Sequence, residues 1–312
     1  MTPLKHLSPS GIGAWVERRD QFYIRYLADK KPPPEPQTQP MSVGSAFDAY
    51  VKVWLADRLG VPLDTDSEEL MRQQVDEELW DFARHAGGVV FEAYKDSGVA
   101  YDLLSELEKS KEISFEFTVM KEIQHKGIGL VLKGIPDLHF YHPEGIKVIL
   151  DWKVNGYCSK TGISPRKGYL MLRGEGAKVH GMHKECVPSH FGDITYNGGM
   201  DFEQVDVSWA RQLAIYGWIT GLDVGQAFIA AIDQVVCRPT GIRIAEHRGI
   251  ISKPFQDFVM DLAVDIWNEC NNGPGYIRFD DMTAEESKAH CEALDNMWAV
   301  AEDDDFMALM GR

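Results

Sequence analysis

Two acidic residues and a lysine stand where predicted strands end, and together they could hold a metal ion. Asp137 closes the segment Gly134-Ile135-Pro136-Asp137, and Asp151 is followed by Trp152 and Lys153. Two carboxylates that converge repel each other unless they share a proton or hold a hard cation between them. Since side chains alternate along a strand, Lys153 shares a face with Asp151, where its ammonium could contact the ion's water or a substrate phosphate.

An ordinary ion pair is the alternative interpretation of these residues. An acid two positions before a lysine also occurs at Asp29 and Lys31, where no site is apparent. Pro-Asp occurs only once in the chain, one predicted strand before Asp151, and this combination is more specific than either half. In the alternative, Asp151 and Lys153 form solvated ion pairs at a sheet edge.

Hydrophobic periodicity predicts the strands that would position these residues. Apolar and polar residues alternate over 112–120, and turn chemistry at 124–127 leads to a hairpin partner over 128–141. A largely apolar third strand is expected over 146–152. The three strands are predicted to form a meander, in which Asp137 and Asp151 can converge.

Helices are predicted on both sides of these strands. Ser8-Pro9 begins a helix that passes through Tyr26, and helical sequence over 67–109 is expected to be interrupted at Gly87-Gly88. The other predicted elements are a helix over 44–59, a helix over 207–220, strands over 227–236 and 242–250, a helix over 254–270 and a helix opened by Thr283-Ala284-Glu285-Glu286.

This order of elements favours an α/β fold with a central mixed β-sheet flanked by helices. We expect a single domain over 1–312, with a helical part over 1–110, a core over 111–250 and an acidic helical tail over 251–312. An insertion over 155–205 is glycine-rich and lacks periodicity, which is typical of a functional loop or a disordered one.

The composition narrows the function classes. With 32 Lys and Arg against 48 Asp and Glu, the net charge of −16 argues against a general nucleic-acid coat protein or a basic membrane-surface protein, although it allows a local basic groove. No uninterrupted apolar run is long enough to span a membrane, and no secretory segment is recognised. The 5 cysteines form no C-x-x-C pair, which is typical of reduced thiols. We expect a cytoplasmic protein without a membrane partner.

Four sequence blocks together resemble one family. They are Leu7-Ser8-Pro9-Ser10 with Phe22-Tyr23-Ile24-Arg25-Tyr26-Leu27, then Gly44-Ser45-Ala46-Phe47, then Gly134-Ile135-Pro136-Asp137 with Asp151-Trp152-Lys153, then Gln212-Leu213-Ala214-Ile215-Tyr216. In this order they resemble the PD-(D/E)xK nucleases, and the last block resembles the Q-x-x-x-Y motif of the RecB-like branch. The resemblance covers residues 7 to about 236 and implies a restriction-endonuclease-like core.

The resemblance implies a metal-dependent phosphodiesterase. Asp137, Asp151 and the main-chain carbonyl of Trp152 would bind one or two Mg²⁺ or Mn²⁺ ions. Lys153 would position or deprotonate the attacking water and offset charge in the transition state.

The resemblance also gives roles to the Q-x-x-x-Y residues. Gln212 and Tyr216, four apart on a helix, would share one face and line the catalytic site. An amphipathic helix with Tyr216 in the core and Gln212 at its rim is the alternative.

The chain departs from the family pattern at several positions. Phe47 stands where the family often has a metal-binding histidine. Asp48 is a candidate replacement ligand, and a site with fewer ligands and a loss of activity are the alternatives. Of the two strand glutamates on the suitable face, Glu112 and Glu116, we favour Glu116 as a further ligand, and a solvent-exposed glutamate without a role in the site is the alternative. Arg18 occupies the place of the first cluster-binding cysteine of some relatives, so no iron-sulfur cluster is expected.

The insertion follows Lys153 directly and is basic. From Lys153 to His190 there are seven Lys or Arg residues and two acids. It could clamp a nucleic-acid strand, or be an unrelated solvated loop. The candidate nucleic-acid-binding residues are Lys160, Arg166, Lys167, Arg173 and Lys178. His180, His183, Cys186 and His190 have zinc-ligand types, but four ligands within such a short segment rarely close a tetrahedron, so zinc is not expected.

The leading hypothesis is a DNA nuclease, most similar to the phage recombination exonucleases, that acts in recombination or repair. Its partners would be DNA and a recombination partner or a separate helicase or annealing protein, in the host cytoplasm if the protein is phage-encoded. Two alternatives remain open: an inactive nuclease fold that binds nucleic acid or a partner, and an acidic DNA mimic. Fourteen acids against three Lys or Arg over residues 255–312 predict that DNA avoids the tail and enters beside the insertion.

Overall fold

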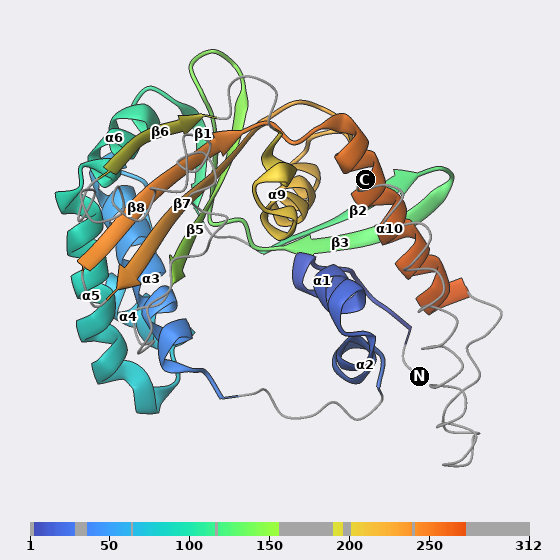
Figure 1. Cartoon of the computed structure of the whole chain (residues 1–312), viewed down its shortest axis with the longest axis horizontal. Helices are drawn as coiled ribbons and strands as arrows, with labels where there is room; N and C mark the ends of the chain where they lie inside the picture. The colour runs from blue at the N-terminus through green and yellow to red at the C-terminus, as the bar shows by residue number, and fades with distance from the viewer. Residues whose placement is uncertain are drawn as a thin grey trace, which may run out of the picture.

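A six-stranded mixed sheet forms the centre of the protein (Figure 1). The computed structural model describes residues 3–28, 36–63, 65–115, 118–155, 190–195, 201–238 and 241–272. The strand order is β1-β4-β5-β7-β8-β6, with β5 parallel to β7, β6 parallel to β8 and the other neighbours antiparallel. The strands are β1 (Lys111–Phe115), β4 (Leu138–Tyr141), β5 (Lys147–Asn155), β6 (His190–Thr195), β7 (Ile229–Arg238) and β8 (Gly241–Gly249). The predicted mixed α/β fold with helices around a central sheet is confirmed.

A separate hairpin, formed by β2 (Val119–His125) and β3 (Ile128–Gly134), corrects the predicted meander. Its tight turn lies where turn chemistry was predicted, with positive φ at Lys126 and Gly127. The expected strands over 112–120 and 128–141 are each divided between this hairpin and the large sheet. The second division has a clear cause, because Pro136 has no N–H to continue a ladder and α9 packs tightly against β3 where it ends at Gly134.

One face of the large sheet is covered by helices from the first third of the chain (Figure 1). The helices on the sheet are α3 (Gln39–Leu59), α5 (Trp80–Asp96) and α6 (Val99–Leu107). Outside them, α4 (Ser67–Gln74) packs on α3 and α5, and the 3₁₀ turn η2 (Glu77–Leu79) packs on α5. The predicted interruption at Gly87-Gly88 is wrong, since α5 runs through both residues. A Cβ at Gly87 would lie 2.5 Å from the Cβ of Ala46, so this glycine allows α3 and α5 to cross closely.

On the other face, α9 (Val207–Ile219) lies between the large sheet and the hairpin (Figure 1). The short turn η4 (Phe202–Gln204) precedes it. The predicted single N-terminal helix is instead α1 (Pro9–Glu17), α2 (Arg19–Phe22) and the π-helix η1 (Tyr23–Leu27), because the backbone leaves helical geometry at Arg18. As predicted, Ser8 caps α1, and Leu7 exchanges backbone hydrogen bonds with β3, which sets α1 against the hairpin.

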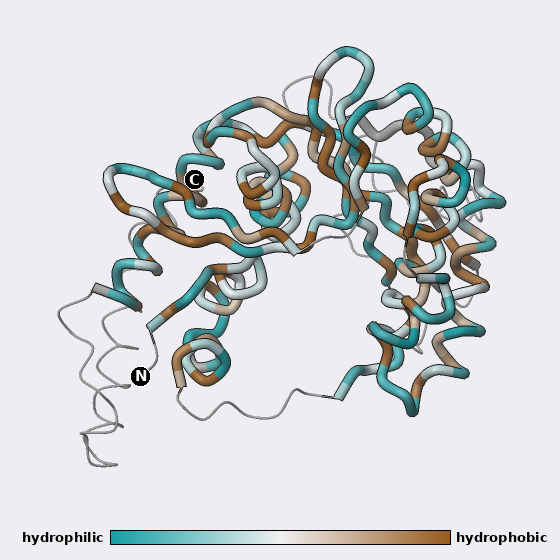
Figure 2. The backbone as a smooth tube through the Cα atoms, turned by 180° about the vertical axis from the view of Figure 1, so that it is seen from behind, coloured by the Kyte–Doolittle hydropathy of each residue, from teal (hydrophilic) through white to brown (hydrophobic). Residues whose placement is uncertain are grey.

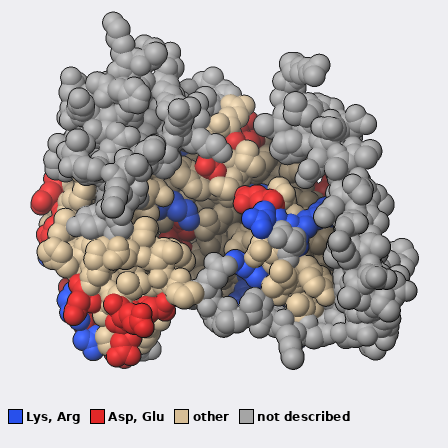
Figure 3. Space-filling model, turned by 60° about the horizontal axis from the view of Figure 1, so that its bottom comes forward, with Lys and Arg blue, Asp and Glu red and all other residues tan. Residues whose placement is uncertain are grey.

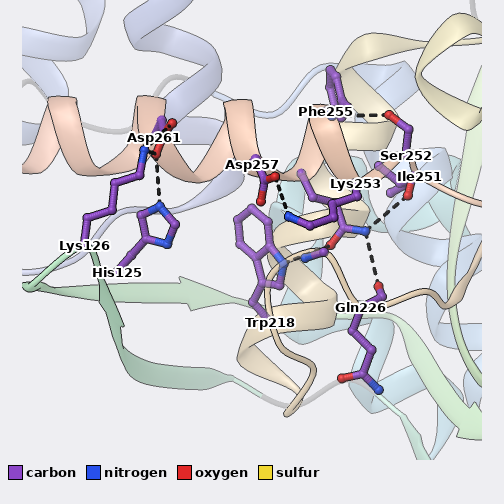
Figure 4. Close-up of polar contacts among 12 residues, drawn as sticks. His125, Lys126, Trp218, Gln226, Ile251, Ser252, Lys253, Phe255, Asp257 and Asp261 are labelled. Atoms are coloured by element: carbon purple, nitrogen blue, oxygen red, sulfur yellow. Dashed lines mark hydrogen bonds and ion pairs between the residues drawn. The ribbon is translucent and has the colours of Figure 1, made fainter.

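The last described helix, α10 (Lys253–Asn272), ties the hairpin to α9 (Figure 4). Asp261 accepts hydrogen bonds from Lys126 at 2.6 Å and pairs with His125 at 3.0 Å, both at the hairpin tip. Trp218 of α9 donates to Gln256 at 3.3 Å. These contacts hold the hairpin and α9 in one layer.

Apolar side chains fill the space on both faces of the sheet. Figure 2 shows hydrophobic segments in the strands, in α9 and in the helices on the other face of the sheet, with polar loops outside. Among the described residues, none of the helices combines the length and apolar character that a membrane crossing requires. Most of the expected insertion over 155–205 and the helix predicted at Thr283 lie outside the described residues.

Adjacent glycines in α5 give a test of the helix crossing. Gly87→Ala should destabilise the protein by about 1 to 3 kcal/mol, because the new methyl group overpacks the contact with Ala46. Gly88→Ala should stabilise it by up to about 1 kcal/mol, because open space surrounds that position and alanine favours the helix. Urea unfolding of both variants measures this, and equal effects would contradict the proposed close crossing.

Candidate functional site

The structure brings Asp137 and Asp151 together. Asp137 immediately precedes β4, and the pairing of Leu138 with Leu150 places it beside Asp151 on β5. The Trp152 N–H donates to Oδ2 of Asp137 at 3.0 Å. Because the N–H and C=O of one residue in an extended strand point to the same edge, the Trp152 carbonyl also points toward the side where Asp137 lies.

Gln212 on α9 connects the other predicted residues. Its Oε1 accepts a hydrogen bond from Lys153 at 3.0 Å, and its Nε2 donates to Asp151 at 3.1 Å and to the Tyr216 hydroxyl at 2.9 Å. The amide therefore uses both of its donors and its acceptor within the site. Lys153 also forms an ion pair with Asp151. Tyr216 fits against the hairpin because Gly134 lacks a side chain there.

Lys52 is a member of the site that the sequence did not reveal. It lies on α3, its side chain is only 2% exposed, and it donates to Oδ1 of Asp137 at 3.2 Å. It also forms an ion pair with Asp48, one helical turn earlier. The helical spacing of Asp48 and Lys52 was visible in the sequence, but the contact with Asp137 joins residues far apart in the chain.

The surroundings of the site raise the pKa values of Asp151 and Lys153 and lower that of Asp137. Burial, and then the neighbouring charge of Asp137, raise the pKa of Asp151 to about 7. Burial acts to raise the pKa of Asp137 as well, but Lys52 and Lys153 outweigh it and hold that pKa below its ordinary value. The pKa of Lys153 is raised, because its attraction to both carboxylates exceeds the effect of burial. Lys153 is therefore a cation in this arrangement.

The donor atoms fit a hard divalent cation. Among the described residues, no group of three or more His, Cys, Asp or Glu side chains could hold a metal ion by itself. Mg²⁺ is often bound through one or two carboxylates and keeps several waters, so Asp137, Asp151 and the Trp152 carbonyl form a suitable set. Burial is the main cause of the raised pKa of Asp151 and the charge of Asp137 adds to it, so a bound cation would stabilise the ionised Asp151 carboxylate.

A cleft of about 1010 Å³ opens onto Lys153, Gln212 and Tyr216. Its walls come from α1, α2, the π-helix, the end of β3 and α9. Its Lys and Arg residues outnumber its single acid, Glu17, in a chain of net charge −16. These basic residues are Arg18, Arg25, Lys133, Lys153 and Arg211. The lower face of Figure 1, seen from below in Figure 3, shows Lys and Arg near its centre.

Of the other candidate ligands, only Asp48 lies near the two carboxylates among the described residues. Phe47 is fully buried and packs edge-on against Tyr94, so it belongs to the core. Asp48 lies next to the two carboxylates, because it pairs with Lys52, which also binds Asp137, and its charge acts on Lys153. Glu112 acts on Lys147, the first residue of β5, four residues before Asp151. Glu116 lies outside the described residues, as do the insertion candidates Lys160, Arg166, Lys167, Arg173 and Lys178.

Comparison with known proteins assigns no family. No protein-family model and no curated protein match the chain. One solved structure, described as the crystal structure of SSO0001, is 11% identical with a TM-score of 0.26, covering 89% of this chain and 95% of that one. A likeness this low carries no argument about function.

The pKa of Asp151 predicts a pH-dependent effect of Asp151→Asn. Between the unfolded pKa of about 3.9 and the folded pKa of about 7, the folded wild type binds the extra proton and loses stability as pH rises. The substituted amide cannot titrate, so the stability of the variant relative to wild type should increase from pH 5 to pH 8. Urea unfolding with EDTA measures this, and a pH-independent difference would contradict the buried carboxylate.

Lys52→Met should destabilise the protein by about 3 to 5 kcal/mol at pH 8, because it leaves Asp137 and Asp48 without their buried cation. The loss of stability should be smaller at pH 4, since the carboxylates near position 52 take up protons more readily in the variant than in the wild type. Lys109→Met, at an exposed position, is the control. An equal loss at both pH values would indicate packing alone.

Proposed function

We propose that this chain is a metal-dependent nuclease that hydrolyses phosphodiester bonds of DNA. The observation that carries the proposal is the convergence of Asp137, Asp151 and Lys153 beside a basic cleft. Lys153 and Gln212 line that cleft, and Gln212 holds both Lys153 and Asp151. Mg²⁺ or Mn²⁺, when bound, would supply an activated water and neutralise charge on the phosphate.

Lys153 has the charge and position for transition-state stabilisation. Its raised pKa favours a protonated ammonium, which offsets the negative charge that develops on the phosphate. Gln212 fixes this ammonium through its carbonyl oxygen while its amide group holds Asp151. Lys153 therefore acts as an electrostatic group and not as the base in this proposal.

The positive charge of the cleft supports a polyanionic substrate. Nucleic-acid binding depends chiefly on Lys and Arg contacts to phosphates, and the cleft concentrates these residues in an otherwise acidic chain. The same observation argues against the DNA-mimic alternative, because a mimic presents acids where this cleft presents bases.

The resemblance to the PD-(D/E)xK nucleases supports a more specific fold and a more specific role. We extend the proposal to a restriction-endonuclease-like core formed by β4, β5, β7 and α9, and to an exonuclease of recombination or repair. The second candidate is an inactive nuclease fold that binds nucleic acid. It is favoured by buried Phe47, which supplies no metal ligand, and by Lys52, which already compensates Asp137.

A cleavage assay tests the proposal. Wild type should degrade end-labelled linear DNA with Mg²⁺ or Mn²⁺ and not with EDTA, and an exonuclease should spare circular DNA. Asp151→Asn and Lys153→Met should each lower the rate by about 100-fold or more, because each removes a charged group at the reacting phosphate. Lys109→Met, an exposed lysine outside the cleft, should retain the rate. Binding by wild type without cleavage under either metal would favour the inactive candidate.

A further inference from the structure

Arg211 is a largely buried cation to which the described residues give no hydrogen bond. It lies on α9 beside Gln212, lines the basic cleft, and is only 8% exposed. Among the described residues its guanidinium makes no hydrogen bond, and its nearest carboxylate, on the largely exposed Glu17, is 3.9 Å away. A buried charge without close partners costs stability, and natural proteins retain such groups where a ligand supplies the missing partner.

The surroundings of Arg211 bring its guanidinium against α1. A Cβ at Gly13 would lie 3.1 Å from the Nη2 atom, so the absence of a side chain at this position makes room for it. Asp206, the N-cap of α9, is a second carboxylate near Arg211, but it is already bound by the N–H groups of Ser208 and Trp209. Neither acid therefore satisfies the planar set of five N–H donors.

We propose that Arg211, seated against Gly13, binds a phosphodiester group of the substrate strand at a subsite separate from the reacting phosphate. Arginine matches the paired oxygens of a phosphate in two parallel hydrogen bonds. The subsite deepens the proposed function and rests on it for the identity of the strand. A strand is favoured over a free phosphate ion because Lys133 lines the same cleft, so a second phosphate of the strand can be held beside the one at Arg211.

The test measures binding of a fluorescent single-stranded oligodeoxynucleotide in EDTA over a series of salt concentrations. Arg211→Met should weaken binding by about 10-fold or more and reduce the slope of log affinity against log salt by about 0.7, the value for one phosphate contact on a single strand. Arg211→Lys should restore the slope but only part of the affinity, since lysine lacks the planar fork. Arg58→Met, an exposed arginine on α3 outside the cleft, should bind like wild type.

Two further measurements separate a binding role from a structural one. Arg211→Met should keep or raise the melting temperature, because it removes a buried charge that no hydrogen bond compensates among the described residues, and a marked fall would overturn the proposal by assigning Arg211 to the fold. Inorganic phosphate should raise the melting temperature of wild type less than the oligonucleotide does; an equal rise would assign the subsite to a free anion instead of a strand. Glu17→Gln should strengthen strand binding, since it removes the competing carboxylate.

The subsite and the nuclease proposal fail in different ways. Wild-type binding in EDTA that Arg211→Met loses supports the subsite even if no DNA is cleaved. Cleavage by wild type together with unchanged binding and salt slope in Arg211→Met overturns the subsite and leaves the nuclease intact. Absence of strand binding by wild type overturns the subsite directly.

Discussion

The repulsion between Asp137 and Asp151 is the constraint on which the site depends. Two carboxylates this close and this buried are tolerated only with positive charge and hydrogen-bond donors around them. The protein supplies these from different elements: Lys52 from α3, Lys153 from β5 and the Gln212 amide from α9. The helices on the two faces of the sheet must therefore approach the sheet at one place, and Asp137 and Asp151 lie at that place.

The position of α9 between the sheet and the hairpin determines how closely the elements around the site approach one another. Gly134 allows Tyr216 to approach the end of β3, and Gly13 allows the Arg211 guanidinium to approach α1. On the other face of the sheet, Gly87 likewise allows α3 and α5 to cross closely. Glycine is used at these positions for close approach, because packing this dense leaves no space for a methyl group.

The distribution of charge separates the cleft from the rest of the chain. The net charge of −16 would repel nucleic acid from most of the surface, whereas the cleft walls carry mainly Lys and Arg. The sequence pointed to the basic insertion as the nucleic-acid-binding part, and that remains a prediction. The described residues place a second basic surface elsewhere, at the junction of α1 and α2, on η1, β3 and α9, directly beside Lys153.

The sequence by itself determined what depends on near neighbours in the chain. Strand alternation put Asp151 and Lys153 on one face, helical spacing put Gln212 and Tyr216 on another, and Ser8-Pro9 marked a helix start, because these patterns arise from backbone geometry over a few residues. Only the tertiary structure decided which distant groups meet. Lys52 reaches Asp137, Arg211 lies against Gly13, and the strand expected over 128–141 divides at Gly134 because α9 packs there. Such contacts depend on how the layers of helices and strands pack on one another, and the local periodicity of the sequence does not predict that packing.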